Sequence, residues 1–454
     1  MMNLSDAASA VGGQLAGQDA QFIGVSSDSR QVAPGQLFVA LKGERFDGHA
    51  YVTEVLAKGA AGALVERDWA ATHGAGLPLV AVDDTLAALG RLAADWRGRF
   101  DIPVIGVTGS NGKTTVKEMI AAILVAEHGA EHMLATAGNL NNAIGLPLTL
   151  LRLRATHRAA VIEMGMNHPG ETAELAAICR PTIALINNAQ REHQEFMKSV
   201  AAVAEEHGAV IAALPATGVA IINADDTYAD YWRSVAAGRS VRDFGLSKPA
   251  AVNARYTLDS NACDMEIETP AGRTQARLET AGLHNVANAL AAIAAAGAAG
   301  AGLEAIRRGL ASFRAVKGRL QYKAGRDGTS VIDDTYNANP DSVRAAIDVL
   351  ASMPGRRILV LGDMGEVGDK AGQFHDEIGG YAKSMGVESL LTLGEYAAAA
   401  AHNFGAGAGH FARSEDLIAA LRPLLGRGVT VLIKGSRFMR MERIVDAIVE
   451  QTQS

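Results

Sequence analysis

A glycine-rich turn between an apolar segment and a helical pattern constrains this chain more than any other feature. Residues 102–105 are apolar and mostly β-branched, which predicts a buried strand, and residues 116–124 have helical spacing. Between them, residues 106–115 read Gly-Val-Thr-Gly-Ser-Asn-Gly-Lys-Thr-Thr. Glycines let main-chain N–H groups approach an anion closely, and a helix N-terminus favours negative charge. The segment therefore predicts a phosphate-binding loop for a nucleoside triphosphate.

The side chains of this loop have expected tasks. Lys113 would reach the terminal phosphates, and the Thr114 hydroxyl would reach Mg²⁺. The other nucleotide-binding residues of the loop would be Gly109, Ser110, Asn111, Gly112 and Thr115. Val107 stands where such loops usually have their first glycine, so a tight turn with an exposed lysine is the alternative. Two hydroxyls beside a cation favour the phosphate site.

Length and composition limit the class of protein. The 454 residues exceed what one core can organise, so two to four domains are expected. The net charge of −7 argues against a nucleic-acid-binding protein, because no basic surplus exists to follow a phosphate backbone. Cys179 and Cys263 are the only cysteines and predict neither a disulfide framework nor a zinc site, which is typical of a cytoplasmic protein.

No targeting or membrane segment is expected. The first residues lack a basic segment followed by an apolar core, so no signal peptide is predicted. The longest weakly polar run, residues 286–303, is mostly alanine and glycine and less apolar than a membrane span requires. We interpret it as a closely packed helix followed by a turn, and we expect no stable membrane insertion.

The chain divides into three blocks, which we expect to be α/β domains of residues 1–100, 101–315 and 316–454. The central block alternates strand and helix patterns, which predicts a parallel sheet with helices on both faces. A change to shorter alternating segments over residues 251–279 predicts an antiparallel addition. The third block alternates again and predicts a second, Rossmann-like sheet. Strands are predicted at residues 36–41, 62–65, 78–82, 104–107, 159–163, 183–187, 219–223, 330–333, 357–361, 390–393 and 429–433, and helices at residues 85–96, 171–178, 199–214, 285–296 and 303–312.

Polar residues follow the central strands where ligands bind in parallel sheets. Glu163 ends a strand and could be an ordinary exposed carboxylate, but beside a triphosphate loop we favour a magnesium ligand. His193 follows the next strand and could be either a surface histidine or a ligand. Asn285 begins a helix, where capping alone could explain it, although an asparagine amide can also read an adenine edge.

Further polar segments lie in the first and third blocks. Residues 317–320, 333–342, 362–366 and 434–437 predict a second polar rim facing a substrate, with Asp341 and Ser342 well placed to cap a helix. Residues 26–30 and 42–49 have the hydroxyls and cations of a small anion site, but they could equally be solvated loops.

Taken together, these motifs resemble the Mur ligases, the amide-forming enzymes of peptidoglycan precursor synthesis. Residues 108–115 are similar to the ATP loop of that family, including its displaced first glycine. The likeness covers almost the whole chain. The other segments that carry it are residues 27–30, 38–44, 47–49, 138–147, 163–165, 285–288, 318–320, 336–340 and 434–437.

The resemblance implies three domains and assigns roles to individual residues. The first domain would grip the UDP end of a nucleotide substrate through Ser29 and Arg30. Glu163 and His193 would place magnesium, and Asn285 and Asn288 would line the adenine side. Arg319 and Asp334 would contact the nucleotide from the third domain. Asn337 and Asn339 would lie near the D-alanyl-D-alanine site.

One position departs from the family pattern. Mur ligases typically carry a carbamylated lysine on the helix after the magnesium-binding histidine, and His207 stands at that position. A histidine cannot form that carbamate. We therefore hypothesise that His207, Glu205 or Glu206 substitutes as a metal ligand or as an orienting group.

The activity implied is that of the branch that joins D-alanyl-D-alanine to UDP-N-acetylmuramoyl-tripeptide, using ATP and Mg²⁺. A peptide carboxylate would be activated as an acyl phosphate, with charge neutralised by Lys113, magnesium and Arg319, and with His193 as a further catalytic residue. The protein would act as a monomer. The alternatives are another ligase of this fold, including one that adds glutamate to folate, a non-ligating ATPase switch, and a silent nucleotide-binding module.

Overall fold

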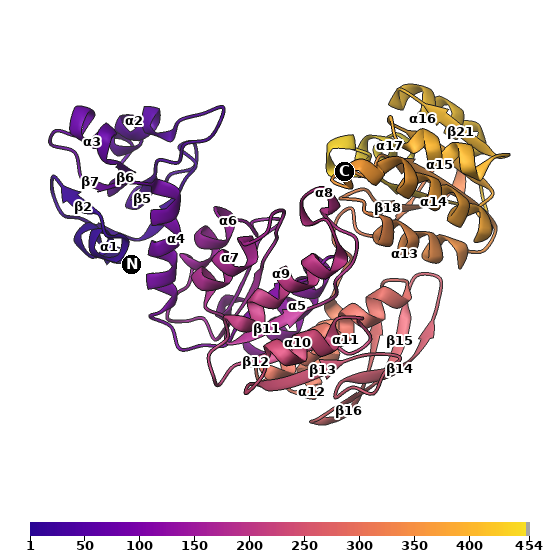
Figure 1. Cartoon of the computed structure of the whole chain (residues 1–454), viewed down its shortest axis with the longest axis horizontal. Helices are drawn as coiled ribbons and strands as arrows, with labels where there is room; N and C mark the ends of the chain where they lie inside the picture. Colours follow the sequence, from indigo (N-terminus) through magenta and orange to yellow (C-terminus); the bar gives the residue numbers. More distant parts are fainter. Residues whose placement is uncertain (451–454) are drawn as a thin grey trace.

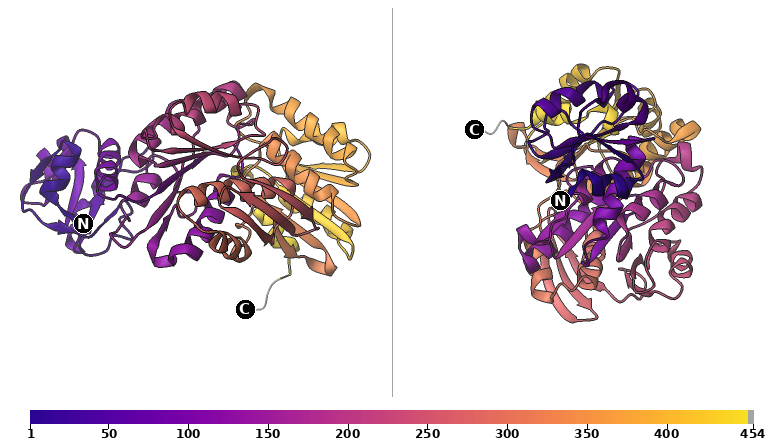
Figure 2. Two further views of the ribbon diagram at one scale, coloured as in Figure 1. Left: turned by 90° about the horizontal axis from the view of Figure 1, so that it is seen from below. Right: turned by 90° about the vertical axis from the view of Figure 1, so that its left-hand side faces the viewer.

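The computed structural model describes residues 1–450 and has an elongated shape built from three lobes. Figure 1 shows the N-terminal lobe at one end, the central lobe in the middle and the C-terminal lobe against the other side of the central lobe. The left-hand view of Figure 2 agrees with this arrangement and shows the N-terminal lobe at the opposite end of the molecule from the C-terminal one. The domain division at residues 1–100, 101–315 and 316–454 stays a prediction, and its last residues, 451–454, lie outside the described chain.

The N-terminal lobe is built on a mixed sheet with the strand order β2-β7-β6-β5-β4. Its strands β4 to β7 are parallel, and β2 pairs antiparallel with β7. The strands are β2 (Gln14–Ala16), β4 (Gly24–Ser26), β5 (Gln36–Val39), β6 (Gly62–Glu66) and β7 (Leu79–Val82), with a separate pair β1 (Met2–Asn3) and β3 (Gln21–Phe22). The helices are α1 (Leu4–Val11), α2 (Val52–Ala57), α3 (Arg67–His73) and α4 (Thr85–Arg97).

The central lobe contains a fully parallel sheet, called the central sheet below, with the order β13-β12-β11-β8-β10-β9. The phosphate loop follows β8, which lies between two buried neighbours. The strands are β8 (Val104–Thr108), β9 (Met133–Ala135), β10 (Ala159–Glu163), β11 (Ile183–Ile186), β12 (Val219–Asn223) and β13 (Ser240–Phe244). The helices are α5 (Lys113–His128), α6 (Gly145–Leu150), α7 (Glu171–Cys179), α8 (Gln194–Met197), α9 (Val200–Ala212) and α10 (Ala229–Val235).

An antiparallel sheet and two helices complete the central lobe. The sheet consists of β14 (Asn253–Leu258), β15 (Cys263–Thr269) and β16 (Gly272–Leu278). Two helices follow it, α11 (Leu283–Ala298) and α12 (Leu303–Ser312). The alanines of α11 are almost all buried, because small side chains let this helix pack closely against α5 and the central sheet. Within residues 1–450, no helix is both long and apolar enough to cross a membrane.

The C-terminal lobe contains a second sheet, the C-terminal sheet, with the order β17-β18-β22-β19-β20-β21. Only β17 runs antiparallel in it. The strands are β17 (Gln321–Ala324), β18 (Ser330–Asp334), β19 (Arg356–Gly362), β20 (Ser389–Leu393), β21 (Ala408–Phe411) and β22 (Val429–Lys434). The helices are α13 (Pro340–Ala351), α14 (Ala371–Ser384), α15 (Ala397–Phe404), α16 (Ser414–Leu421) and α17 (Glu442–Ile448). Short 3-10 helices of this lobe are η3 (Arg326–Gly328), η4 (Gly368–Lys370), η5 (Arg422–Leu424) and η6 (Arg437–Met439); η1 (Gly48–Tyr51) lies in the N-terminal lobe and η2 (Ala130–His132) in the central lobe.

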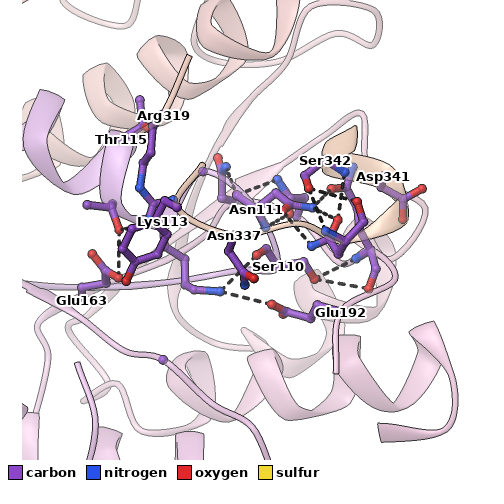
Figure 3. A pocket seen from close by; sticks show the side chains of 18 of the residues that line it. Ser110, Asn111, Lys113, Thr115, Glu163, Glu192, Arg319, Asn337, Asp341 and Ser342 are labelled. Carbon is purple, nitrogen blue, oxygen red and sulfur yellow. Dashed lines mark hydrogen bonds and ion pairs between the residues drawn. The ribbon is translucent and has the colours of Figure 1, made fainter. Parts of the chain in front are cut away.

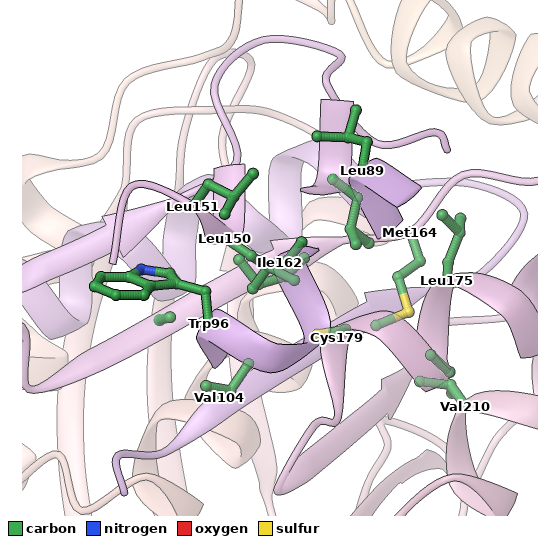
Figure 4. Close-up of a cluster of buried hydrophobic side chains, with 14 of the residues drawn as sticks. Leu89, Trp96, Val104, Leu150, Leu151, Ile162, Met164, Leu175, Cys179 and Val210 are labelled. Atoms are coloured by element: carbon green, nitrogen blue, oxygen red, sulfur yellow. The ribbon is translucent and has the colours of Figure 1, made fainter. Parts of the chain in front are cut away.

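Helix α4 joins the N-terminal lobe to the central sheet through a continuous apolar core. Leu89 and Trp96 of α4 pack with Ile162 and Met164 of the β10 region, as Figure 4 shows. The Trp96 indole N–H also donates to the Leu153 carbonyl at 3.1 Å. The buried indole is therefore both packed and hydrogen-bonded, which fixes α4 against the central lobe.

The predicted α/β class and the main elements are confirmed, because the strong apolar patterns coincide with buried strands. The expected antiparallel addition is present as β14 to β16. The strands that the sequence did not predict are mostly short or partly exposed, and their burial patterns carry little periodicity. They include β2, β9, β13, β17 and β21.

Candidate functional site

A cavity of about 1190 Å³ lies where the carboxyl end of the central sheet faces the C-terminal lobe. Its walls come from elements far apart in the sequence, and Figure 3 shows their side chains converging. The predicted site residues that line it are Ser110, Asn111, Gly112, Lys113, Thr114, Thr115, Glu163, His193, Asn285, Asn288, Arg319, Asp334, Asn337 and Asn339.

Glycines allow the phosphate loop to follow its path between β8 and α5. Gly109 and Gly112 have φ values of +133° and +83°, a region that side chains rarely permit. A Cβ at Gly112 would also lie only 2.4 Å from the Asn288 side-chain oxygen. The loop is held from below, where Ser110 N–H donates to the Asn188 carbonyl at 3.0 Å and Asn111 N–H to the Asn188 side-chain oxygen at 2.8 Å.

Lys113 begins α5 and folds back over the loop. Its Nζ donates to the carbonyl of Gly109, to the carbonyl of Ser110 at 3.1 Å, and to Glu192 Oε2 at 3.2 Å. The lysine side chain is 15% exposed, so its charge lies at the cavity wall rather than in bulk solvent. The lysine is therefore not exposed, unlike the lysine of the alternative tight turn, while its contact with phosphates stays a prediction.

Thr114, Glu163 and Arg319 meet beside the loop. The Thr114 hydroxyl donates to Glu163 Oε1 at 3.1 Å and accepts from Arg319 Nη2 at 2.9 Å. Asn141 Nδ2 also donates to Glu163 Oε1, at 2.7 Å. The other carboxylate oxygen, Glu163 Oε2, is buried and has no protein partner among the described residues. A buried carboxylate oxygen left free beside a hydroxyl is a donor set that suits Mg²⁺.

Glu192 is a buried carboxylate that the sequence did not single out. His207 Nε2 lies 2.9 Å from Glu192 Oε1, and His207 Nδ1 lies 3.0 Å from the Thr108 hydroxyl. Burial alone would raise the pKa of Glu192, but Lys113 and the hydrogen bond from His207 outweigh it and lower that pKa to about 2. Glu192 is therefore ionised and fixed from both sides.

The residues suggested in place of a modified lysine fall into different environments. His207 is fully buried with both ring nitrogens engaged, so it orients Glu192 and does not face the cavity as a metal ligand. Glu206 accepts from Gly170 N–H and Thr172 N–H at 2.8 and 2.7 Å and so caps α7. Glu205 is exposed on α9. Of the two roles hypothesised, only the orienting one fits His207.

His193 lines the cavity with a left-handed backbone conformation. It is the residue before α8 and has φ +46°, a region uncommon for a histidine. Its Nδ1 lies 2.6 Å from Glu366 Oε2 of the C-terminal lobe. Across residues 1–450, no three His, Cys, Asp or Glu side chains gather as a ready metal site. A metal at Glu163 and His193 therefore remains a prediction.

A chain of asparagine amides runs behind the phosphate loop. Asn288 Nδ2 donates to Asn285 Oδ1 at 3.2 Å, and Asn187 Nδ2 donates to Asn288 Oδ1 at 2.9 Å and to the Asn111 carbonyl at 2.8 Å. The interpretation of Asn285 as a helix cap is wrong. Gly282 precedes α11, and Asn285 lies inside the helix, where its amide donates back to the Ala281 carbonyl at 2.7 Å.

The first turn of α13 meets the loop from the C-terminal lobe. Asn339 caps α13 and forms a capping box with Ser342, which confirms the capping role predicted for Ser342. Asn339 Nδ2 also donates to Asn111 Oδ1 at 2.9 Å. Asp341 does not act as the cap; instead it accepts from Arg191 Nη2 at 2.6 Å, and Arg191 also pairs with Glu377 at 2.9 Å.

Arg319 and Asp334 approach the loop from the start of the C-terminal lobe. The Arg319 guanidinium stacks over Tyr336, 4.1 Å from the ring centroid, which holds it toward Thr114. Asp334 accepts from Lys434 Nζ at 2.6 Å and from Leu320 N–H at 3.1 Å. Lys434 also donates to the Asn337 carbonyl, so these groups form one polar rim, as the sequence predicts.

Ser29 and Arg30 are not part of this cavity. They lie in the N-terminal lobe between β4 and β5, and Arg30 pairs with Asp28 at 2.8 Å while staying largely exposed. A UDP contact at these residues therefore remains a prediction about a separate region.

Sequence reasoning missed Glu192, Asn141 and Arg191 as members of the site. Each acts through a partner at least 22 positions away, such as Glu163 for Asn141 and Asp341 for Arg191. The available signal for Arg191 and Glu192 was the density of polar residues directly after β11, and for Asn141 it was the polar segment between β9 and α6.

Comparisons with known proteins agree with the geometry. Residues 21–97, 107–296 and 318–437 match the models described as Mur ligase family, catalytic domain; Mur ligase middle domain; and Mur ligase, glutamate ligase domain. The chain is 42% identical to the UDP-N-acetylmuramoyl-tripeptide–D-alanyl-D-alanine ligase of Escherichia coli K12, over 99% of this chain and 98% of that protein.

Solved structures show the same likeness. The chain superposes on MurF from Acinetobacter baumannii with a TM-score of 0.90 and 34% identity, covering 98% of each chain. A MurF ligase from Thermotoga maritima in complex with ADP gives a TM-score of 0.82 and 26% identity, covering 93% of this chain and 96% of that one. With these matches spanning all three lobes, the chain belongs to the Mur ligase family.

Proposed function

We propose that this protein joins D-alanyl-D-alanine to the terminal carboxylate of UDP-N-acetylmuramoyl-tripeptide, with ATP converted to ADP and phosphate, in peptidoglycan precursor synthesis. The proposal rests on the similarity of almost the whole chain to the UDP-N-acetylmuramoyl-tripeptide–D-alanyl-D-alanine ligase of Escherichia coli. The geometry agrees with it, because a phosphate loop and a cation from another lobe meet at one cavity of about 1190 Å³.

The reaction requires anions to approach each other. An oxygen of the peptide carboxylate attacks the γ-phosphorus of ATP, ADP leaves, and an acyl phosphate forms. The dipeptide amine then attacks the acyl carbon, and phosphate leaves. No covalent enzyme nucleophile is needed, so the protein acts by positioning and by neutralising charge. Lys113 and Arg319 supply the cations nearest the loop, and His193 is a further catalytic candidate.

The donor set beside the loop fits a magnesium ion. Thr114 and Glu163 would hold it, because Glu163 keeps a buried oxygen without a protein partner in the described chain. His193, which lines the same cavity, would be a further ligand. When bound, magnesium would neutralise charge on the phosphate oxygens. The Thermotoga maritima ligase that this chain resembles was solved with ADP, which supports the assignment of ATP as cosubstrate.

The remaining contacts extend the proposal to both substrates. Asn285, Asn288 and Asp334 would bind the nucleotide with the loop residues Ser110 to Thr115, which line the cavity. Gly109 is not among the lining residues, and a nucleotide contact there stays a prediction. The dipeptide side would be formed by Asn337 and Asn339, and the UDP group would contact Ser29 and Arg30. We further propose three domains, a monomer that works in the cytoplasm, and no nucleic-acid partner; the net charge of −7 supports the last point.

An ADP-release assay tests the activity. Purified protein is given ATP, Mg²⁺ and UDP-muramoyl tripeptides ending in lysine or diaminopimelate, with and without D-alanyl-D-alanine. We expect ADP in proportion to the ligated product, and only when the tripeptide and the dipeptide are both present. ATP hydrolysis that ignores the dipeptide would instead support an ATPase switch, and turnover with folate and glutamate would support the other ligase class.

A further inference from the structure

The ammonium group of Lys113 has no free donor in the described structure. An ammonium carries three N–H bonds. Its acceptors are the carbonyls of Gly109 and Ser110 and the carboxylate of Glu192. A phosphate that is to bind this lysine must therefore displace at least one protein acceptor. Glu192 is the only one of these acceptors that carries a charge.

Glu192 cannot swing freely, because its other oxygen is anchored. Oε1 is bound by His207, a fully buried side chain whose second nitrogen meets Thr108 at the end of β8. The carboxylate itself is 5% exposed. A chain of polar contacts thus connects Thr108 of β8 to Lys113 through two buried side chains, His207 and Glu192. Glu192 Oε2 is the oxygen that accepts from Lys113.

We propose that Glu192, positioned by His207, occupies the place of a phosphate oxygen on Lys113 and competes with ATP for that lysine. The pair keeps the cation folded over its loop until the triphosphate takes over the contact. Glu192 and His207 are positioning residues, since neither needs to touch the reacting atoms. The inference rests on the proposed phosphate role of Lys113.

This competition has a cost and a benefit. Displacing a charge-assisted hydrogen bond weakens the binding of ATP. In return, the lysine stays at one place instead of sampling many rotamers, so it is aimed when the nucleotide arrives. Removing the charge of Glu192 should therefore strengthen ATP binding while slowing turnover. A purely structural carboxylate would weaken both or neither.

The test measures ATP binding by calorimetry in EDTA, without the peptide substrates, so that no reaction occurs. Glu192→Gln is expected to bind ATP about tenfold more tightly than the unchanged protein. With Mg²⁺ and all substrates, its kcat should fall. Glu195→Gln is the matched control, because Glu195 is an exposed carboxylate on the same segment without a contact to Lys113. Its ATP affinity should stay within twofold.

His207→Phe tests the positioning step, because it keeps a ring but removes both hydrogen bonds. It is expected to tighten ATP binding by less than Glu192→Gln does, since Glu192 remains but is no longer held. Should this variant fail to fold, the Glu192→Gln measurement still decides the question.

The outcomes separate this inference from the proposed function. Lys113→Ala is included and should weaken ATP binding. If it does so while Glu192→Gln binds ATP no more tightly than the unchanged protein, the competition is refuted and the phosphate role of Lys113 stands. If Lys113→Ala binds ATP as well as the unchanged protein, the phosphate role itself is refuted.

Discussion

The central and C-terminal sheets both end in polar rims, but they balance charge differently. In the central sheet, Glu163 retains a buried oxygen without a partner in the described chain, and Lys113 lies over an anion-binding loop. In the C-terminal sheet, Asp334 pairs with Lys434 at 2.6 Å and Asp333 with Lys323 at 2.7 Å. The central rim thus pairs Lys113 with Glu192 but leaves one Glu163 oxygen without a partner in the described chain, whereas the C-terminal rim is internally neutralised and mainly contributes the reach of Arg319.

Lys113→Ala tests the central rim and should have the largest effect. Removing the cation that faces the triphosphate is expected to lower kcat by about 10³-fold. The buried Glu192 carboxylate loses this partner as well, so the melting temperature should also fall, but the protein should stay folded at the assay temperature. ADP release and thermal unfolding measure the two quantities. A variant that unfolds instead of losing turnover would erase the contrast between the rims.

Lys434→Met tests the opposite behaviour at the C-terminal rim. The substitution leaves Asp334 without its buried ion-pair partner, and unfolding free energy should drop by about 3 kcal/mol. Denaturant titration measures the loss. The double variant Lys434→Met with Asp334→Asn should recover part of it, because the uncompensated charge is then gone. No recovery would mean that Lys434 stabilises the lobe by packing alone.

Arg319→Ala examines the cation that reaches from the C-terminal lobe to Thr114 of the phosphate loop. We expect kcat to fall about 10²-fold, because the charge beside Thr114 is lost. Arg319→Lys should restore only part of the rate, since lysine lacks the planar group that stacks on Tyr336. Full activity in Arg319→Ala would show that the central rim suffices without help.

His284 gives the smallest effect and concerns pH. Burial lowers the pKa of this α11 residue to about 4, with Asp334 and Asp348 opposing the change and Lys434 adding to it. The unfolded chain takes up its proton near pH 6.5, so the contribution is complete above that pH and is lost as pH falls toward 4. Between pH 7 and 4.5, His284→Gln should lose about 2 kcal/mol less unfolding free energy than the unchanged protein does. Equal losses in the two proteins would show that protonation of His284 does not contribute to the loss of stability at low pH.

The sequence predicted the regular parts of the molecule and one wall of the site. Strands such as β8 and β10 are apolar along their whole length, so local pattern suffices to find them. Glu163 and Lys113 were found because each stands at a strand end or a loop with its own signature. Arg319 and Asp334 were predicted from the sequence as members of a polar rim, but their roles toward the nucleotide were expected only from resemblance, since those roles depend on a contact between lobes.

The other contacts of the site could not be predicted from the local sequence, because they depend on which side chains the fold buries together. Glu192 sits among other polar residues in the sequence, and only the fold brings it to His207 and Lys113. His207 was expected at a metal or as an orienting group, and its complete burial selects the second role. Asn285 does not cap α11, because the helix begins at Leu283, two residues before this asparagine.

The contact between Asn111 and Asn339 is made of uncharged amides, whereas Arg191, Asp341 and Glu377 form the ionic part of the same boundary. Mobile ions weaken attraction between partly exposed charges and leave amide pairing nearly untouched. Concentrated salt should therefore weaken the contacts of Arg191 with Asp341 and Glu377 and leave the contact between Asn111 and Asn339 intact. The C-terminal lobe would then pivot about the phosphate loop instead of separating from it.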